Sequence, residues 1–175
     1  MTACVAAPPT TETPTFRQYA IRGGDGIDGL VVRDTARRPL GEHDVRVRIR
    51  AVALNYRDLM VARGTAGTPG RTLVPASDGA GEVIEVGAAV TGLQVGDRVI
   101  STFFPDWLAG PAKGHVAACP LGGSMDGEVA EEVVVPARAW VPMPVHLDFA
   151  EAATLTCAGV TAWHDVLASA CKPTP

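Results

Sequence analysis

The residues best suited to chemistry lie together in one short segment, Asn55-Tyr56-Arg57-Asp58. Tyr56 carries a phenolic O–H group, which can donate a hydrogen bond to a developing oxyanion and can also supply a proton. The structural alternative is a tyrosine that only packs its ring at the start of a helix. Asn55 suits the capping position of that helix. Asp58 is a candidate acid–base group, and its structural alternative is pairing with a nearby arginine.

Cysteine and histidine do not gather into a metal-binding pattern. The four cysteines are widely spaced without a C-x-x-C pair, and the four histidines show no ligand spacing. Zinc takes about four ligands from Cys, His and carboxylate side chains, so this spacing predicts no metal site. A chain of this size without an export signal is expected to keep its cysteines reduced. His115, in a long loop, is the one histidine that deserves further attention.

Short strands and tight turns, rather than long helices, are expected to position these side chains. The chain has 175 residues, which is enough for one well-buried domain. It contains 19 Gly and 14 Pro, and charged residues make up only 19%, against a typical value of about 25%. This composition favours β structure over helix.

Charge and hydropathy exclude two classes of partner. The net charge is −4, and basic residues such as Arg46, Arg48 and Arg50 are scattered rather than clustered, so we predict no nucleic-acid partner. No stretch approaches the roughly 18 consecutive apolar residues of a membrane span. Residues 1–15 lack the features of a signal peptide and are predicted to be a disordered tail. We therefore expect a cytoplasmic protein that does not associate with membranes.

The clearest strand is predicted at 44–53, where apolar residues alternate with three arginines. This alternation indicates a half-buried strand with a charged outer face. A hairpin is predicted before it, from a strand at 16–21, the glycine-rich loop 23–26 and a strand around 30–32.

Glycine is dense in the stretch 73–100, which predicts a compact arrangement of turns and strands. We expect a turn of small residues at 77–81, a strand around 83–86 and a second strand around 99–100. Between and after these strands we predict a short helix within 54–64 and loops at 65–71 and 101–123. A strand is predicted at 127–136 and an extended connector at 140–144. Two helices follow: one capped by Asp148 and Glu151, and a last one from 161 to about 170 that ends at Lys172-Pro173.

The run SDGAGEV, followed by VGAAVTGLQVGDRVI, resembles the G-x-E/D-x-x-G-x-V and G-D-x-V signature of the medium-chain dehydrogenase/reductase superfamily. The resemblance covers about residues 19–167. It implies a mainly β, GroES-like, partly open barrel with a few short helices and two C-terminal helices that lead toward a Rossmann domain. We expect the tail at 1–15, the catalytic domain at 16–146 and the junction helices at 147–175.

Zinc-dependent members of that superfamily hold a catalytic zinc at positions that match Asn55, Ser77 and Cys157 here. Only Cys157 is a competent ligand, and its alternative role is that of a small buried hydrophobic residue. The family's structural zinc lobe would fall in 101–123, which contains Cys119 alone. The resemblance therefore implies that no zinc is bound.

Zinc-free relatives, the quinone oxidoreductases and enoyl reductases, carry an N-[YF]-x-D segment that Asn55-Tyr56-Arg57-Asp58 matches. The resemblance implies hydride transfer from NADPH or NADH, which leaves an enolate that needs a hydrogen-bond donor and a proton. Tyr56 and Asp58 become the candidate catalytic residues. Asn55, Tyr56 and Thr161 become the candidate cofactor contacts, although Thr161 could instead mark a close helix-packing site.

The leading interpretation is the catalytic half of a zinc-independent NAD(P)H-dependent oxidoreductase that reduces quinones or activated alkenes such as enones. No dinucleotide-binding fingerprint occurs within the 175 residues, so the chain is expected to be inactive without its Rossmann half. A homodimer of the full-length protein is compatible with this interpretation. The alternatives are the catalytic domain of a zinc-type alcohol dehydrogenase and a non-catalytic GroES-like binding or assembly module. The substrate and the choice between NADH and NADPH stay open.

Overall fold

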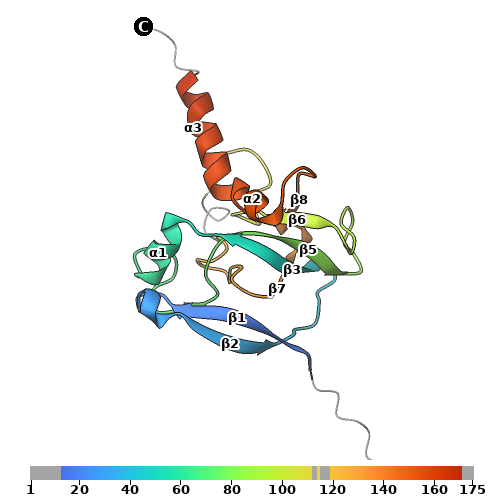
Figure 1. Ribbon diagram of the computed structural model, residues 1–175, viewed down its shortest axis with the longest axis horizontal. Helices are drawn as coiled ribbons and strands as arrows, with labels where there is room; N and C mark the ends of the chain where they lie inside the picture. The colour runs from blue at the N-terminus through green and yellow to red at the C-terminus, as the bar shows by residue number, and fades with distance from the viewer. Residues whose placement is uncertain (1–12, 112–113, 115–118, 171–175) are drawn as a thin grey trace, which may run out of the picture.

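The computed structural model describes residues 13–111, 114 and 119–170, and these form a mainly β structure, as predicted (Figure 1). A three-stranded sheet has the order β2-β1-β4, and a five-stranded sheet has the order β7-β3-β5-β6-β8. The strands are β1 (Thr15–Arg22), β2 (Val31–Ala36), β3 (Asp44–Ala53), β4 (Thr72–Leu73), β5 (Asp78–Val86), β6 (Arg98–Ser101), β7 (Glu132–Pro136) and β8 (Trp140–Pro142).

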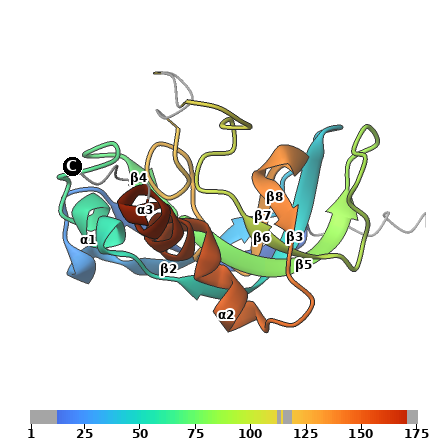
Figure 2. The ribbon, with the colours of Figure 1, turned by 90° about the horizontal axis from the view of Figure 1, so that it is seen from above.

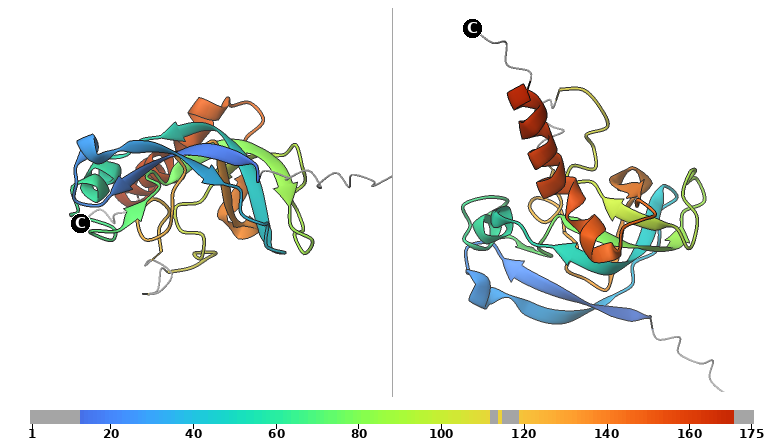
Figure 3. Two further views of the ribbon diagram at one scale, coloured as in Figure 1. Left: turned by 90° about the horizontal axis from the view of Figure 1, so that it is seen from below. Right: turned by 45° about the horizontal axis from the view of Figure 1, so that its top comes forward.

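Short helical segments connect and cover these strands. Seen from below, the β1–β2 hairpin lies across the five-stranded sheet (Figure 3, left). Seen from above, α3 is viewed nearly end on, with α1 to its left (Figure 2). The segments are the 3₁₀ turns η1 (Ile27–Gly29) and η3 (Ala137–Ala139), the π-helical turn η4 (Leu155–Gly159), and the α-helices α1 (Tyr56–Ala62), α2 (Phe149–Ala153) and α3 (Val160–Ala170).

Buried valines of the five-stranded sheet form the main hydrophobic cluster. Val45 and Val47 of β3, Val83 of β5 and Val99 of β6 have no exposed surface. Each fully buried side chain of this kind contributes roughly 1.5–3 kcal/mol through the hydrophobic effect. A second cluster fixes α2 against the sheet, where Ala152 and Ala153 pack with buried residues of β5 and β6. The sheet and α2 therefore form one packed unit.

The predicted strand 44–53 is confirmed as β3, and the predicted hairpin is confirmed by the antiparallel pairing of β1 with β2. The prediction that the charged face of β3 is exposed is wrong at Arg46, whose side chain is only 4% exposed. Arg46 stays on the opposite face of β3 from the buried Val45 and Val47, since β3 pairs with β7 without a break, but the segment around Arg38 covers it there.

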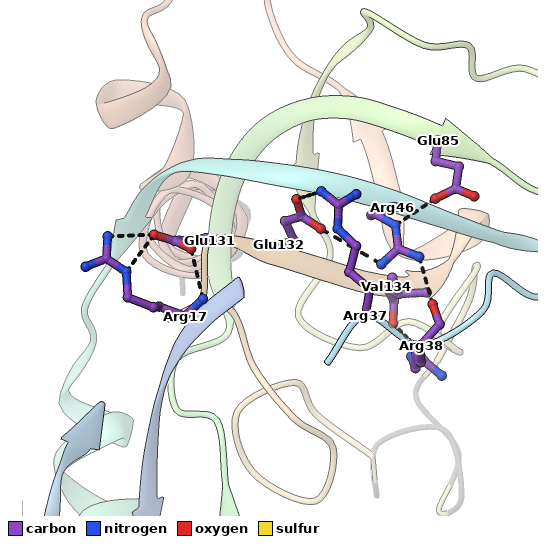
Figure 4. A network of polar contacts seen from close by, with 8 residues as sticks. All are labelled: Arg17, Arg37, Arg38, Arg46, Glu85, Glu131, Glu132 and Val134. Atoms are coloured by element: carbon purple, nitrogen blue, oxygen red, sulfur yellow. Dashed lines mark hydrogen bonds and ion pairs between the residues drawn. The ribbon is translucent and has the colours of Figure 1, made fainter. Parts of the chain in front are cut away.

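Arg46 lies in a polar network between the loop before β3 and strand β7 (Figure 4). Its Nε donates to Glu85 Oε2 at 2.7 Å, and its Nη2 donates to the carbonyl of Arg38 at 2.8 Å. Buried Glu132 pairs with Arg37 and lies 4.0 Å from Arg46. These ion pairs compensate the charge of a buried guanidinium.

The predicted turn at 77–81 is also wrong, because residues from Asp78 onward belong to the single strand β5. The glycines there serve close packing rather than turning. A Cβ on Gly81 would collide with the backbone of β3 at Arg48, and a Cβ on Gly79 would collide with the carboxyl group of Glu128. Besides bulges and tight bends, a strand contains glycine where another part of the molecule approaches its backbone closely.

The predicted strand at 127–136 is shorter than expected, because β7 covers only Glu132–Pro136. An isolated bridge between Gln18 and Ala130 lies before it and links the two sheets. The predicted connector at 140–144 extends the five-stranded sheet as β8.

The predicted helices are confirmed. The N-terminus of α2 carries the expected capping box, in which Asp148 Oδ1 accepts from Glu151 N at 2.8 Å and Asp148 N donates to Glu151 Oε2 at 3.0 Å. α3 projects away from both sheets (Figure 1; Figure 3, right). The described part of the chain contains no helix that is long and apolar enough to cross a membrane. His115, the end of the last helix at 172–173 and most of the predicted tail lie outside the described residues.

Candidate active site

A cavity of about 470 Å³ lies between α1, η4 and α3, and we call it the α1–α3 cavity. It brings together the three predicted cofactor contacts, Asn55, Tyr56 and Thr161. Asn55 and Tyr56 are adjacent in the sequence, whereas Thr161 lies far from both. Residues at the start of α1 border the cavity together with residues of η4 and the first half of α3. The full lining is Asn55, Tyr56, Arg57, Phe103, Cys157, Ala158, Thr161, Ala162 and Asp165.

A second cavity of about 550 Å³ shares Phe103, Cys157 and Thr161 with the first, and we call it the aromatic cavity. Three aromatic side chains line it in series. The rings of Phe103 and Phe104 lie 4.5 Å apart, and those of Phe104 and Trp107 lie 6.1 Å apart. A flat apolar molecule fits such a lining better than a charged one.

Tyr56 is the first residue of α1 and is 72% exposed, so its ring is not packed in the core. The structural alternative, a tyrosine that packs its ring at the start of the helix, therefore lacks support. Tyr56 lines the α1–α3 cavity, where an incoming molecule can reach it. Neighbouring Arg57 adds a positive charge to the same lining, and its guanidinium lies 4.5 Å from the centre of the Phe103 ring.

Asn55 and Asp58 together begin α1. The backbone N–H of Asn55 donates to Asp58 Oδ2 at 2.8 Å, which is the return bond of a capping box. Burial raises the pKa of Asp58, and the bond from Asn55 opposes this shift. Asp58 does not line either cavity. The structure thus brings Asn55 to the cavity and leaves Asp58 beneath the helix as a capping residue.

Asp78 lies beneath Asn55 and is completely buried. It accepts hydrogen bonds from Asn55 Nδ2 and from Ser77 Oγ, each at 2.9 Å. Burial raises the pKa of Asp78, and these two bonds act in the opposite direction. Asp78 therefore orients the Asn55 amide from below the cavity.

The three positions that match the zinc ligands of relatives do not form a donor set that fits zinc. Asn55 and Ser77 both donate to Asp78, and neither side chain is a usual zinc ligand. Burial and the charge of Asp78 raise the pKa of Cys157, which favours the thiol over the thiolate that binds metal. No cluster of three or more His, Cys, Asp or Glu arranged for a metal ion occurs in the described ranges. Cys157 is half-buried and lines both cavities, so it is more accessible than a core residue.

Sequence reasoning missed several residues of this site. Phe103, Phe104 and Trp107 could have been found, because three aromatic residues within five positions stand out in a chain with only 5% aromatic residues. Asp78 and Glu128 gave no such signal, since acidic residues in a Gly-rich segment and in a run of glutamates ordinarily face solvent.

Comparisons with known proteins identify the family of this chain. Residues 41–145 match the family described as Alcohol dehydrogenase GroES-like domain. The chain therefore belongs to this family, within the medium-chain dehydrogenase/reductase superfamily.

Three relatives illustrate the range of the family. A zinc-type alcohol dehydrogenase-like protein of Schizosaccharomyces pombe is 41% identical over 131 residues, which cover 74% of this chain and 38% of the relative. A quinone oxidoreductase of Pseudomonas aeruginosa is 35% identical over 145 residues, which cover 82% of this chain and 38% of the relative. The crystal structure of a putative alcohol dehydrogenase from Sinorhizobium meliloti superimposes with a TM-score of 0.80 at 40% identity, over 91% of this chain and 48% of the other. The chain thus spans about half or less of these relatives.

Proposed function

We propose that this chain is the catalytic half of a zinc-independent oxidoreductase that uses NADPH or NADH to reduce a quinone or an activated alkene. The observation that carries the proposal is the meeting of Asn55, Tyr56 and Thr161 around one cavity, beside a second cavity lined by aromatic rings. The proposed division places the catalytic domain at 16–146 and the junction helices at 147–175. The quinone oxidoreductase relative supports the same class of substrate.

The cofactor, when bound, supplies a hydride. Reduction of a quinone or enone leaves negative charge on a substrate oxygen, which needs a hydrogen-bond donor and then a proton. Tyr56 holds a proton on an exposed phenolic oxygen, and the positive charge of Arg57 in the same lining stabilises an oxyanion. Asn55 and Thr161 supply polar contacts for the cofactor, while Ala158 and Ala162 leave room for a flat ring.

Exposed apolar side chains on α3 support a further domain beside this chain. Val160, Trp163, Val166 and Leu167 are each about half exposed or more. Helix faces of this kind are usually covered in the complete protein. In the proposed enzyme, the cofactor-binding half covers this face of α3 and closes the α1–α3 cavity.

A zinc-type alcohol dehydrogenase is the second candidate, and the relative from Schizosaccharomyces pombe favours it by name. The donor set at Asn55, Ser77 and Cys157 opposes it.

One assay separates the two candidates. The full-length polypeptide that contains these residues is dialysed against EDTA and assayed for reduction of duroquinone and 2-cyclohexenone with NADPH and with NADH. The proposal predicts reduction of at least one of these substrates at a rate that added zinc does not change. Zinc-dependent oxidation of alcohols without either reduction would establish the second candidate instead.

A further inference from the structure

The side chain of Glu128 is an unusual buried acid beneath the candidate active site. It has no exposed surface, and within the described structure neither of its carboxyl oxygens makes a hydrogen bond of ordinary geometry, although the Ser101 hydroxyl lies near enough to lower its pKa. Its Oε2 occupies the space that a Cβ on Gly79 would fill. Buried polar groups without partners are uncommon in folded proteins, so this carboxyl group calls for an explanation.

The backbone, rather than the carboxyl group, holds Glu128 in place. Its N–H donates to the carbonyl oxygens of Pro75 and Ala76 at 3.0 and 3.1 Å. The preceding N–H, of Gly127, donates to Val74 O at 2.7 Å. The side chain is therefore directed under β5 by the course of its own segment.

Asp78 is the charged group that acts on Glu128, and the Ser101 hydroxyl is the nearby polar group. Arg57 and Asp58 of α1 act on Asp78 from its other side. Burial is the main cause that raises the pKa of Glu128 to about 8; the charge of Asp78 acts in the same direction, and the Ser101 hydroxyl acts against it. Two carboxyl groups that share a buried site ionise in separate steps, and with its pKa at about 8 Glu128 keeps its proton near neutral pH.

We propose that Glu128 is a positioning residue for the α1–α3 cavity: as a neutral acid it leaves Asp78 as the single carboxylate that orients Asn55, and its ionisation disturbs that contact. The route is short. Glu128 packs on Gly79, the residue after Asp78, and Asp78 accepts from Asn55 Nδ2 at 2.9 Å. Asp78 also influences the Cys157 thiol. Glu128 thus adjusts two groups of the cavity lining without lining it, and this inference does not depend on the substrate or the cofactor.

Carbon-detected NMR on the 175-residue chain tests the first part of the proposal. The carboxyl carbon of Glu128 is expected to titrate with a midpoint near 8. The side-chain carbonyl carbon of Asn55 is expected to shift with the same midpoint. A Glu128 midpoint near 4.5, or an Asn55 signal that does not move with it, would overturn the proposal. This measurement needs no variant, so it does not depend on how a variant folds.

The reactivity of Cys157 toward a disulfide reagent tests the second part. In a background where Cys4, Cys119 and Cys171 are serine, the thiolate pKa of Cys157 is measured from the pH dependence of the reaction rate. Glu128 is ionised above about pH 8, in the range where the raised pKa of Cys157 is measured, so Glu128→Gln removes a negative charge there and is expected to lower the Cys157 pKa. Glu131→Gln, on an exposed glutamate nearby in the sequence, serves as the control and should leave it unchanged. An unchanged Cys157 pKa in the folded Glu128→Gln variant would contradict the coupling.

Discussion

Raising the pH from 5 to 8 should destabilise this chain, and replacing Glu128 with glutamine should remove most of that effect. The pKa of Glu128 is raised from 4.5 to about 8 in the folded state. The folded protein therefore binds a proton that the unfolded chain has already released. The stabilising contribution of this proton is complete below about pH 4.5, declines as the pH rises, and is lost once the pH passes 8.

The size of the effect follows from the two pKa values. At about 1.4 kcal/mol per pKa unit, the shift from 4.5 to about 8 corresponds to a total decline of roughly 5 kcal/mol in the free energy of unfolding, of which about 3–4 kcal/mol falls between pH 5 and pH 8. Domains of this kind are stable by about 5–15 kcal/mol in total, so the decline is large enough to measure. Burial also raises the pKa values of Asp58 and Asp78, which act in the same direction.

Urea unfolding at pH 5, 6, 7 and 8, followed by circular dichroism, measures this decline. Glu128→Gln also buries an amide whose N–H groups need partners, which lowers stability equally at every pH. The slope against pH is therefore the informative quantity, rather than the stability at any one pH. Glu131→Gln is the control, because the exposed Glu131 pairs with Arg17 and its pKa is lowered. A Glu128→Gln variant with the same slope as the wild-type chain would refute the reasoning.

Four further predictions follow from the site and the fold. In the full-length enzyme, Tyr56→Phe should lower kcat by about 10²–10⁴-fold with a smaller change in KM and an unchanged melting temperature. Tyr19→Phe is the matched control. An unchanged kcat in the Tyr56→Phe variant would remove Tyr56 from the mechanism. Glu132→Ala should lower the free energy of unfolding by about 3 kcal/mol because it leaves Arg46 and Arg37 without their buried partner, whereas Glu131→Ala should cost less than about 1 kcal/mol; equal effects of the two variants would contradict the burial argument. Elemental analysis after dialysis against trace zinc should find far less than one metal ion per chain, and stoichiometric zinc would refute the zinc-free proposal. Calorimetric titration of the 175-residue chain with NADPH should show no micromolar binding, and a clear isotherm would reveal a cofactor site within it.

Local patterns were enough to predict the elements that carry the site. Alternation predicted the bounds of β3, and the pair Asp148 and Glu151 predicted the start of α2. These signals act over a few residues, through side-chain periodicity and helix capping. The meeting of Asn55 with Thr161 came from the family resemblance, since no local pattern relates residues so far apart.

The errors arose where tertiary contacts override local preference. Gly79 and Gly81 suggested a turn, but they lie in β5 because neighbouring groups approach the strand too closely for a Cβ. Arg46 suggested an exposed face, but the segment around Arg38 covers it, and Glu85 and Glu132 compensate its charge. Glu128 could not be distinguished by type or spacing from Glu131, although one is fully buried and the other is exposed.

The π-helical turn Leu155–Gly159 sets the rotation of the helix that follows it. Gly159 N–H donates to Thr154 O at 3.1 Å, five residues back, so this turn holds one residue more than an α-helical turn. Each residue of an α-helix advances the side chains by about 100° around the axis. Losing one residue here would let the turn become α-helical and would rotate α3 by about that angle. Thr161 would then leave the α1–α3 cavity, and the apolar face of α3 would point in a different direction. The number of residues in this single turn thus determines whether Thr161 lines the α1–α3 cavity and in which direction the apolar face of α3 points.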